Sequence, residues 1–286
     1  MSRKKVLAFI LSICVALSMM PSLAFAEEVS GGSPKTIYVD SNATGEKPDG
    51  KESNPYKTLE AAMGVAKDSD TIKLLSDIAE SVTLGSTAGV TLDLNDKKLT
   101  GGNDHAIKVV KDTKLTINDT GANKTGTVDS IVHGKAAIYN EGTITLNGGN
   151  YLRSMETGTN PNVGGSNSYY NILSHGVMTI NDGVKVSQTG HYSSLIASGW
   201  SKGGENTGKT DSVLTINGGF FSGGINTIKN DDYGILTING GVFENITQHA
   251  VQNHNIAKVT GGKFTGTEKA TVILANNADP SSGFVR

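Results

Sequence analysis

The stretch Leu236-Thr-Ile-Asn-Gly-Gly-Val-Phe243 decides the fold, because near copies of it return along the chain. The copies run over Leu214 to Phe221, Ile144 to Tyr151, Met178 to Val186 and Ala257 to Phe264. Apolar residues on either side of a threonine are typical of a strand with one buried face, and paired glycines are typical of a tight turn. A strand and turn that repeat in this way predict a solenoid of short stacked strands.

The repeat has a basic period near 22 residues, and some copies carry insertions. One apolar position was aligned through the copies: Leu94, Ile117, Leu146, Ile180, Ile216, Ile238 and Val259. The steps between these residues are 23, 29, 34, 36, 22 and 21. We therefore predict an all-β fold for residues 70–286, a right-handed parallel β-helix with about 22 residues in each coil.

The same alignment predicts two columns of side chains that run from coil to coil. Asparagines precede the glycine turn at Asn95, Asn118, Asn147, Asn181, Asn217 and Asn239. We expect each amide to bond the backbone of the next coil. Aromatic residues follow the turn at Tyr151, Phe221, Phe243 and Phe264, and we expect them to form one stack.

The first 26 residues have the features of a secretory signal peptide. A basic start at Arg3 to Lys5 precedes an apolar run from Val6 to Leu17, with small residues at Ala24 and Ala26. A membrane span needs about 20 apolar residues, and no stretch of the chain is that long. We therefore expect an exported protein, secreted or held at the cell surface, with no membrane span.

The residues between the signal peptide and the solenoid are predicted to form a leader, a strand and a helix. Residues 27–35 are predicted to be a flexible leader, and residues 36–69 a first strand with a short helix over Thr58 to Lys67. Leu59, Ala62, Met63 and Ala66 share one face of that helix. Because the first coil of a solenoid exposes its apolar cross-section, we expect the helix to cap it.

Composition argues against several classes of partner and cofactor. The single cysteine, Cys14, lies in the signal peptide, so the exported chain has no disulfide. Removing Arg3, Lys4 and Lys5 from the 25 basic residues leaves 22 against 27 acidic ones, a net charge of −5. The charges form no long runs, so no nucleic acid partner is predicted.

Four histidines stand at turns without the spacing of metal ligands, and we interpret them as surface residues: His105, His133, His191 and His249. No metal and no cofactor is predicted.

Several segments resemble known proteins. Ile37-Tyr-Val-Asp40, Asn54-Pro-Tyr-Lys-Thr-Leu-Glu-Ala-Ala62 and Asp70-Thr-Ile-Lys-Leu74 resemble the opening of secreted bacterial right-handed parallel β-helix proteins of the pectate-lyase-like superfamily. Thr91-Leu-Asp-Leu-Asn-Asp-Lys-Lys-Leu-Thr-Gly101 and the later repeats are similar to surface β-helix domains of Gram-positive bacteria. The resemblance covers almost the whole exported chain. It implies the fold, and it leaves activity open among lyases, hydrolases and adhesins.

A polar edge is predicted where one column of strands ends. That column consists of Asn140, Ser174, Ser198, Asn230 and Asn253, and the residues just after it are Glu141, His175, Trp200, Asp231, Asp232 and His254. Coils stack about 4.8 Å apart, so these side chains would line up along the solenoid. Trp200, the only tryptophan, would offer an apolar face to a sugar ring while its neighbours bond hydroxyl groups. The alternative interpretation is that exposed links simply favour polar residues.

Two insertions interrupt the period, and loops on a rigid scaffold often bind ligands. The first, between Tyr151 and Asn171, includes Arg153 and Glu156, and the second, Gly199 to Ser212, includes Lys202, Glu205 and Asp211.

Two classes of function fit these features. The first is a non-catalytic extracellular β-helix that acts in adhesion or glycan binding, with an extracellular glycan or another cell-surface component as its partner. The second is a secreted carbohydrate-active enzyme, either a calcium-dependent lyase or a glycoside hydrolase, that acts on acidic polysaccharide.

The catalytic sets of both enzyme types are incomplete in the sequence. A lyase needs carboxylates on calcium and a base, for which Arg153 or Lys202 would serve, but no Asp-rich calcium loop is present. Ser174-His175-Gly176 and Asn230-Asp231-Asp232 resemble polygalacturonase motifs in the reverse order. Neighbouring aspartates on a strand also point to opposite faces, whereas a glycosidase needs two carboxyl groups across one sugar.

Overall fold

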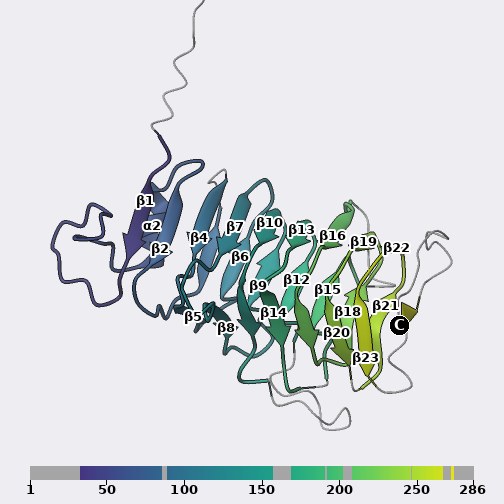
Figure 1. The fold of residues 1–286 in the computed structure, drawn as a ribbon. Coiled ribbons are helices and arrows are strands. Elements are labelled where there is room, and N and C mark those ends of the chain that lie inside the picture. Colours follow the sequence, from purple (N-terminus) through teal and green to yellow (C-terminus); the bar gives the residue numbers. More distant parts are fainter. Residues whose placement is uncertain are drawn as a thin grey trace, which may run out of the picture. The chain divides into compact units, whose positions relative to one another are not determined.

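The structure is a computed structural model that describes residues 33–85, 89–156, 169–190, 192–201, 208–245, 247–266 and 272–273. The predicted signal peptide and most of the leader lie outside these residues, as do His191, Lys202 and Glu205. Within the described part of the chain the structure has strands β1 to β24 and a single helix, α2 (Figure 1).

All the strands belong to three parallel sheets. The first sheet contains β1 (Thr36–Val39), β2 (Thr71–Leu74), β4 (Val90–Asp93), β7 (Lys114–Asn118), β10 (Thr143–Leu146), β13 (Val177–Ile180), β16 (Ser212–Ile216), β19 (Gly234–Ile238) and β22 (Ile256–Val259). The second contains β5 (Lys98–Gly101), β8 (Thr127–Ser130), β11 (Gly149–Leu152), β14 (Val184–Ser187), β17 (Phe220–Ser222), β20 (Val242–Asn245) and β23 (Lys263–Gly266). The third contains β3 (Val82–Leu84), β6 (Ile107–Val109), β9 (Ile138–Asn140), β12 (Ile172–Ser174), β15 (Ile196–Ser198), β18 (Asn226–Asn230), β21 (His249–Asn253) and β24 (Val272–Ile273).

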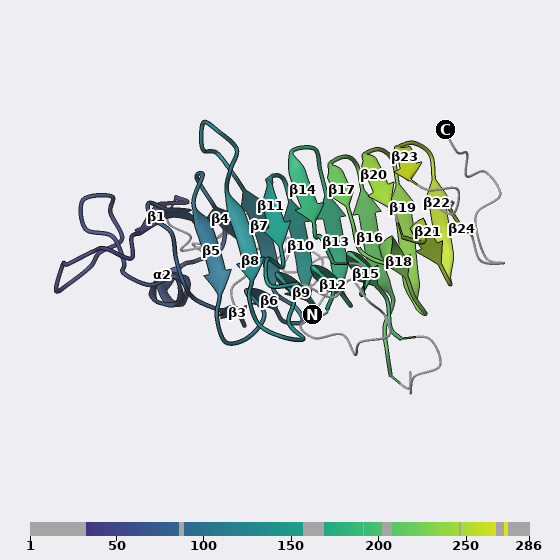
Figure 2. The ribbon, with the colours of Figure 1, turned by 90° about the horizontal axis from the view of Figure 1, so that it is seen from below.

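From β4 onward the chain visits the three sheets in turn, so each of these coils adds one strand to each sheet (Figure 2). The predicted parallel β-helix is therefore confirmed. β1 pairs with β2, so the first sheet starts at Thr36, ahead of the predicted start at residue 70.

The repeated stretch supplies the core of the first sheet. Leu214 pairs with Leu236, and Leu236 pairs with Ala257, as the alignment predicts. All three side chains are buried. Each leucine contributes about 1.5 to 3 kcal/mol by leaving water, and equivalent residues in neighbouring coils make this burial continuous.

The alignment is wrong in the earliest coil. Leu92, not Leu94, pairs with Ile117, and Asp93 pairs with Asn118. The cause is a turn without glycine after β4, in which Asn95 has a φ of 49°. This left-handed turn replaces the usual glycine pair and shifts the apparent repeat by two residues.

The asparagine column exists, but its bonds differ from those predicted. Each amide nitrogen donates to the side-chain oxygen of the asparagine in the preceding coil, from Asn147 to Asn118 (2.9 Å), Asn181 to Asn147 (2.7 Å), Asn217 to Asn181 (2.8 Å) and Asn239 to Asn217 (2.9 Å). Asn95 stands outside this ladder and donates to the carbonyl oxygen of Leu74. Because the asparagines occupy equivalent positions in parallel coils, each side-chain amide lies within hydrogen-bond distance of the next one, and these bonds form in place of bonds to the backbone.

We expect Asn181→Asp to lower the free energy of unfolding by about 1 kcal/mol, because a carboxylate cannot donate to Asn147 but still accepts from Asn217. Denaturant unfolding at neutral pH measures the change. Lys185→Ala, an exposed change on the next strand, is the control and should shift the free energy by less than about 0.5 kcal/mol. Equal effects of the two changes would show that the ladder does not stabilise the solenoid.

The aromatic stack is shorter than predicted. Phe221 stacks on Phe243 with ring centroids 4.9 Å apart, and Phe243 stacks on Phe264 at 4.8 Å. Tyr151 is separated from this stack by one coil, in which Val186 pairs with both Tyr151 and Phe221. The buried Tyr151 hydroxyl instead donates to the carbonyl oxygen of Gly148 at 2.9 Å.

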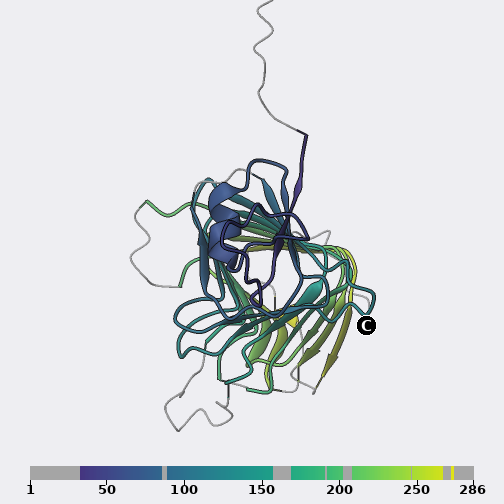
Figure 3. The same cartoon turned by 90° about the vertical axis from the view of Figure 1, so that its left-hand side faces the viewer.

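Helix α2 (Leu59–Val65) contacts β1 and β3 at the first coils (Figure 3). Thr58 caps its start by accepting from the amide of Ala61, and Leu59 and Ala62 are buried. The helix is shorter than predicted because Ala66 adopts an extended conformation. In the described residues no helix has the length and apolar character needed to cross a membrane.

Candidate functional site

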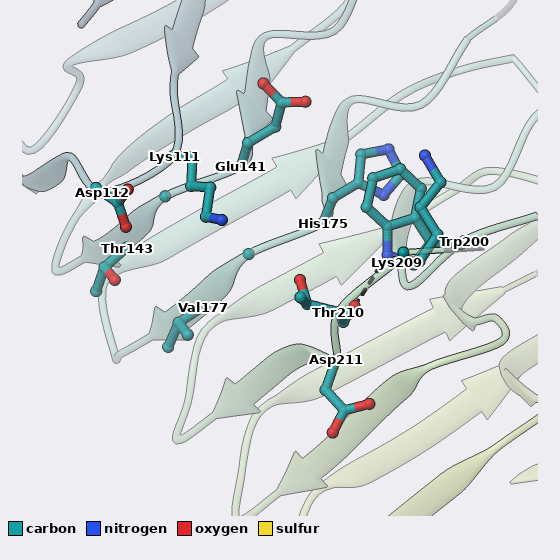
Figure 4. A pocket seen from close by; sticks show the side chains of 13 residues that line it. Lys111, Asp112, Glu141, Thr143, His175, Val177, Trp200, Lys209, Thr210 and Asp211 are labelled. Atoms are coloured by element: carbon teal, nitrogen blue, oxygen red, sulfur yellow. Dashed lines mark hydrogen bonds between the residues drawn. The ribbon is translucent and has the colours of Figure 1, made fainter. Parts of the chain in front are cut away.

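The predicted polar edge lies where the chain passes from the third sheet to the first. These passages, called links below, contain Glu141 between β9 and β10, His175 between β12 and β13, and the second insertion between β15 and β16. A pocket of about 440 Å³ opens over these three links and the link before β7, and Glu141, His175 and Trp200 all line it (Figure 4). Half of the predicted site residues are therefore brought together.

A buried polar column fixes where each link begins. Asn140, Ser174, Ser198, Asn230 and Asn253 pair in register, as predicted. The column is held by bonds between neighbours, such as the 3.0 Å bond that the Asn140 amide donates to the Ser174 hydroxyl. Asn140 also accepts from the amide of Gly142 at 3.1 Å, which ties the link to the column. Buried polar groups that are satisfied in this way make the base of the pocket rigid.

Trp200 lies one residue farther along its link than Glu141 and His175 do along theirs. Gly199 takes the position equivalent to His175, because its amide donates to Ser174 just as that of His175 donates to Asn140. Gly199 has a φ of 96°, and a Cβ atom there would lie 2.7 Å from the carbonyl oxygen of Asp232. The position therefore requires glycine, and the indole is carried on the next residue.

The indole of Trp200 is fixed by three contacts. It stacks on the His175 imidazole with centroids 3.8 Å apart and planes at 10°. Its Nε1 donates to the carbonyl oxygen of Thr210 at 3.0 Å, and its backbone amide donates to Asp232 at 2.8 Å. These contacts hold the indole in one rotamer at the pocket.

The ammonium of Lys209 lies over the same ring, 3.8 Å from its centroid. The imidazole and the ammonium each lie 3.8 Å from the ring centroid, so there is room for the ammonium only on the face opposite the imidazole. The expectation that Trp200 offers a bare face is thus wrong for this structure. A ligand reaches the ring only when the flexible lysine stem moves aside.

No protein-family model, curated protein or solved structure matches this chain. The resemblance to pectate-lyase-like proteins therefore stays a prediction, and the site is interpreted from its own chemistry. Among the described residues, no three histidine, cysteine or acidic side chains lie close enough together to hold a metal ion.

His175 is held as a neutral hydrogen-bonding group. Burial lowers the pKa of its imidazole below the usual value. Its Nδ1 lies 2.8 Å from the carbonyl oxygen of Gly199, which can only accept, so Nδ1 donates and Nε2 is left as an acceptor. Glu141 accepts from the Tyr139 hydroxyl at 3.2 Å. The pocket thus combines an aromatic surface with a carboxylate and an imidazole.

Rings from four coils form a row that leads to the pocket. His105 stacks on Tyr139 with centroids 4.7 Å apart, and Tyr139 meets the edge of His175 at 5.6 Å. The interpretation of His105 as a surface residue is wrong, because only 8% of it is exposed and its Nδ1 accepts from the amide of Ala136. Burial lowers the pKa of His105 to about 4. By contrast, His133 is exposed, as predicted.

Acid is expected to destabilise the protein through His105. Its native pKa of about 4 lies below the unfolded value of 6.5, so the unfolded chain takes up a proton first. Stability is lost as pH falls from about 6.5 to about 4, by on the order of 2 kcal/mol after discounting for partial solvation. Denaturant unfolding across this range should show a smaller loss for His105→Gln, whose amide does not titrate. His133→Gln is the control, and identical pH profiles for the two variants would contradict this assignment.

The remaining predicted site residues do not line the pocket. Asp231 is 4% exposed, and its Oδ2 lies 2.9 Å from the Lys229 ammonium. Asp232 meets Trp200 only through the main-chain bond described above. His254 begins the link of the next coil, where its amide donates to Asn230. The pocket therefore occupies only the part of the predicted edge that contains Glu141, His175 and Trp200.

Sequence reasoning missed two groups of pocket residues. Lys111 and Asp112 line it from the link before β7. Val109 pairs with Asn140, so extending the polar column by one coil would have found them. Lys209 and Thr210 return from the second insertion, and no spacing in the sequence indicates that they face Trp200.

The first insertion begins with a structural ion pair. The Arg153 guanidinium lies 2.6 Å from the Glu156 carboxylate, and the two side chains are 1% and 0% exposed. Arg153 also donates to the carbonyl oxygens of Val132 and Lys135. It is therefore buried away from substrate, which removes it as the base of the lyase alternative.

Proposed function

We propose that the protein is a non-catalytic glycan-binding β-helix that acts outside the cell. One observation carries the proposal. The only tryptophan of the chain lines a pocket built from four successive links, beside an imidazole and a carboxylate. An aromatic face with a few polar groups around it is the combination that recognises a sugar, which has an apolar ring face and a rim of hydroxyls.

The scaffold supports this function because the links and the indole that line the pocket are already ordered without a ligand. The links start from the buried polar column, and the indole is stacked and hydrogen-bonded before any ligand arrives. A site that is ordered in advance loses less entropy on binding. The same proposal includes export through Met1 to Ala26, which predicts that the secreted protein starts after residue 26; amino-terminal sequencing checks this.

Trp200→Ala is expected to weaken glycan binding by about tenfold or more, because the aromatic surface is lost. Calorimetric titration with a panel of neutral, acidic and amino-sugar oligosaccharides measures the change. Tyr233→Ala is the matched control, since this aromatic residue is 38% exposed on another link and does not line the pocket. An affinity that is unchanged in Trp200→Ala, or the absence of any binding in the panel, would overturn the proposal.

Turnover would overturn the non-catalytic part separately. The same oligosaccharides are incubated with the protein, with and without calcium, and assayed for unsaturated products and for new reducing ends. We expect neither signal to exceed that of the Trp200→Ala variant.

A further inference from the structure

The Lys209 ammonium marks a place for a cation on the pocket wall. It lies 3.8 Å from the centroid of the Trp200 ring. Tryptophan is the aromatic residue that attracts cations most strongly through its ring face. Within the described residues, Lys209 forms no ion pair with a carboxylate, so the indole face is the contact that holds its charge.

The rest of the pocket is acidic. Among the residues that the structure describes, Asp112, Glu141 and Asp211 bring three carboxylates to its lining, and Lys111 is the one other ammonium there. Burial lowers the pKa of His175, so the imidazole adds no positive charge at neutral pH. When the Lys209 side chain swings away from the indole, the wall therefore has carboxylates in excess and an uncovered aromatic face.

We infer that the glycan bound here carries a cationic group, a free amine of an amino sugar, which replaces the Lys209 ammonium on Trp200. This inference rests on the proposed glycan-binding function and names the substrate class of the same pocket. An acidic sugar fits less well, because its carboxylate would enter among three like charges. A neutral sugar would displace the lysine without replacing its charge on the ring.

Lys209 then acts as an internal competitor. While its ammonium covers the indole, the site is closed, and the apparent affinity of a ligand is reduced by the fraction of closed molecules. Removing the lysine side chain should increase the affinity for a cationic glycan. The same change should reduce the affinity for an acidic glycan, which would lose a positive partner.

The test compares three short oligosaccharides of equal length on the full exported chain: glucosamine oligomers, N-acetylglucosamine oligomers and galacturonate oligomers. The pH is chosen so that the free amines are protonated. We expect the glucosamine oligomer to bind at least about tenfold more tightly than its N-acetylated equivalent. Lys209→Ala should tighten glucosamine oligomer binding by about fivefold. Glu141→Gln and Asp211→Asn should each weaken it.

Controls separate this contact from general attraction between a polycation and an acidic protein. Trp200→Ala keeps the net charge, so binding that remains in this variant measures the general attraction. Equal binding of the acetylated and free-amine oligomers would overturn the inference and leave the proposed function standing. Tighter binding of galacturonate oligomers that is lost in Lys209→Ala would do the same. Failure of all three oligomers to bind would count against the proposed function itself.

Discussion

Phe243→Ala is expected to lower the free energy of unfolding by about 3 to 5 kcal/mol. The ring is fully buried and lies between Phe221 and Phe264, with centroids 4.9 and 4.8 Å away. The change removes the transfer energy of the side chain, leaves a cavity and breaks both stacking contacts. Denaturant unfolding, with its midpoint and slope, measures the loss.

Two comparisons make this result specific. Phe243→Leu keeps most of the volume and should cost less than about half as much. Val177→Ala removes a side chain that is 41% exposed on the first sheet and should have little effect. Equal losses for Phe243→Ala and Val177→Ala would contradict a continuous core under the second sheet.

Glu156→Ala is expected to lower the free energy of unfolding by about 3 to 5 kcal/mol, because it leaves the Arg153 guanidinium buried without its carboxylate. The carboxylate also accepts from the backbone amide of Tyr169 at 3.2 Å, so the segment after the first insertion loosens as well. Thermal and denaturant unfolding of the single variant measure the cost.

The double variant Arg153→Met, Glu156→Leu is the control for charge burial. It replaces the ion pair with apolar side chains of similar size, and such replacements are often close to neutral. We expect it to recover most of the stability lost in Glu156→Ala. A double variant no more stable than the single one would show that the bonds from Arg153 to the carbonyls of Val132 and Lys135 dominate.

The sequence repeat predicts the strand register correctly in the coils that contain a glycine turn. Leu214, Leu236 and Ala257 stack as the spacing predicts. The prediction failed at Leu94, where a left-handed turn at Asn95 does without glycine and hides the true register. Local backbone conformation of this kind leaves little trace in a pattern of apolar residues.

The candidate site was predictable only in part. Glu141 and His175 follow strand ends that repeat, so their common edge could be inferred from the alignment. Lys209 reaches the indole from the far side of an insertion, and such a contact depends on the path of a loop rather than on the period. The position of Arg153 in an insertion predicts a candidate base on a surface loop, yet the side chain is buried with Glu156.

The location of the pocket follows from the way a repeat protein divides its residues between scaffold and surface. Residues that recur in every coil are committed to the core, the asparagine ladder and the buried polar column. The links and insertions are free to vary, and the pocket is made from them together with the first residues of β10 and β13. Trp200 belongs to both the scaffold and the pocket. Its backbone amide bonds the next coil, and its ring bonds the end of the second insertion.

Fluorescence of Trp200 tests the central claim most directly, because this residue is the only tryptophan in the chain and its emission reports on the pocket alone. Titration of the unmodified protein with the oligosaccharide panel should give a saturable change in emission for at least one sugar. Its dissociation constant should equal that from calorimetry. A sugar that binds by calorimetry without changing the emission of Trp200 would contradict the assignment of this pocket as the glycan site.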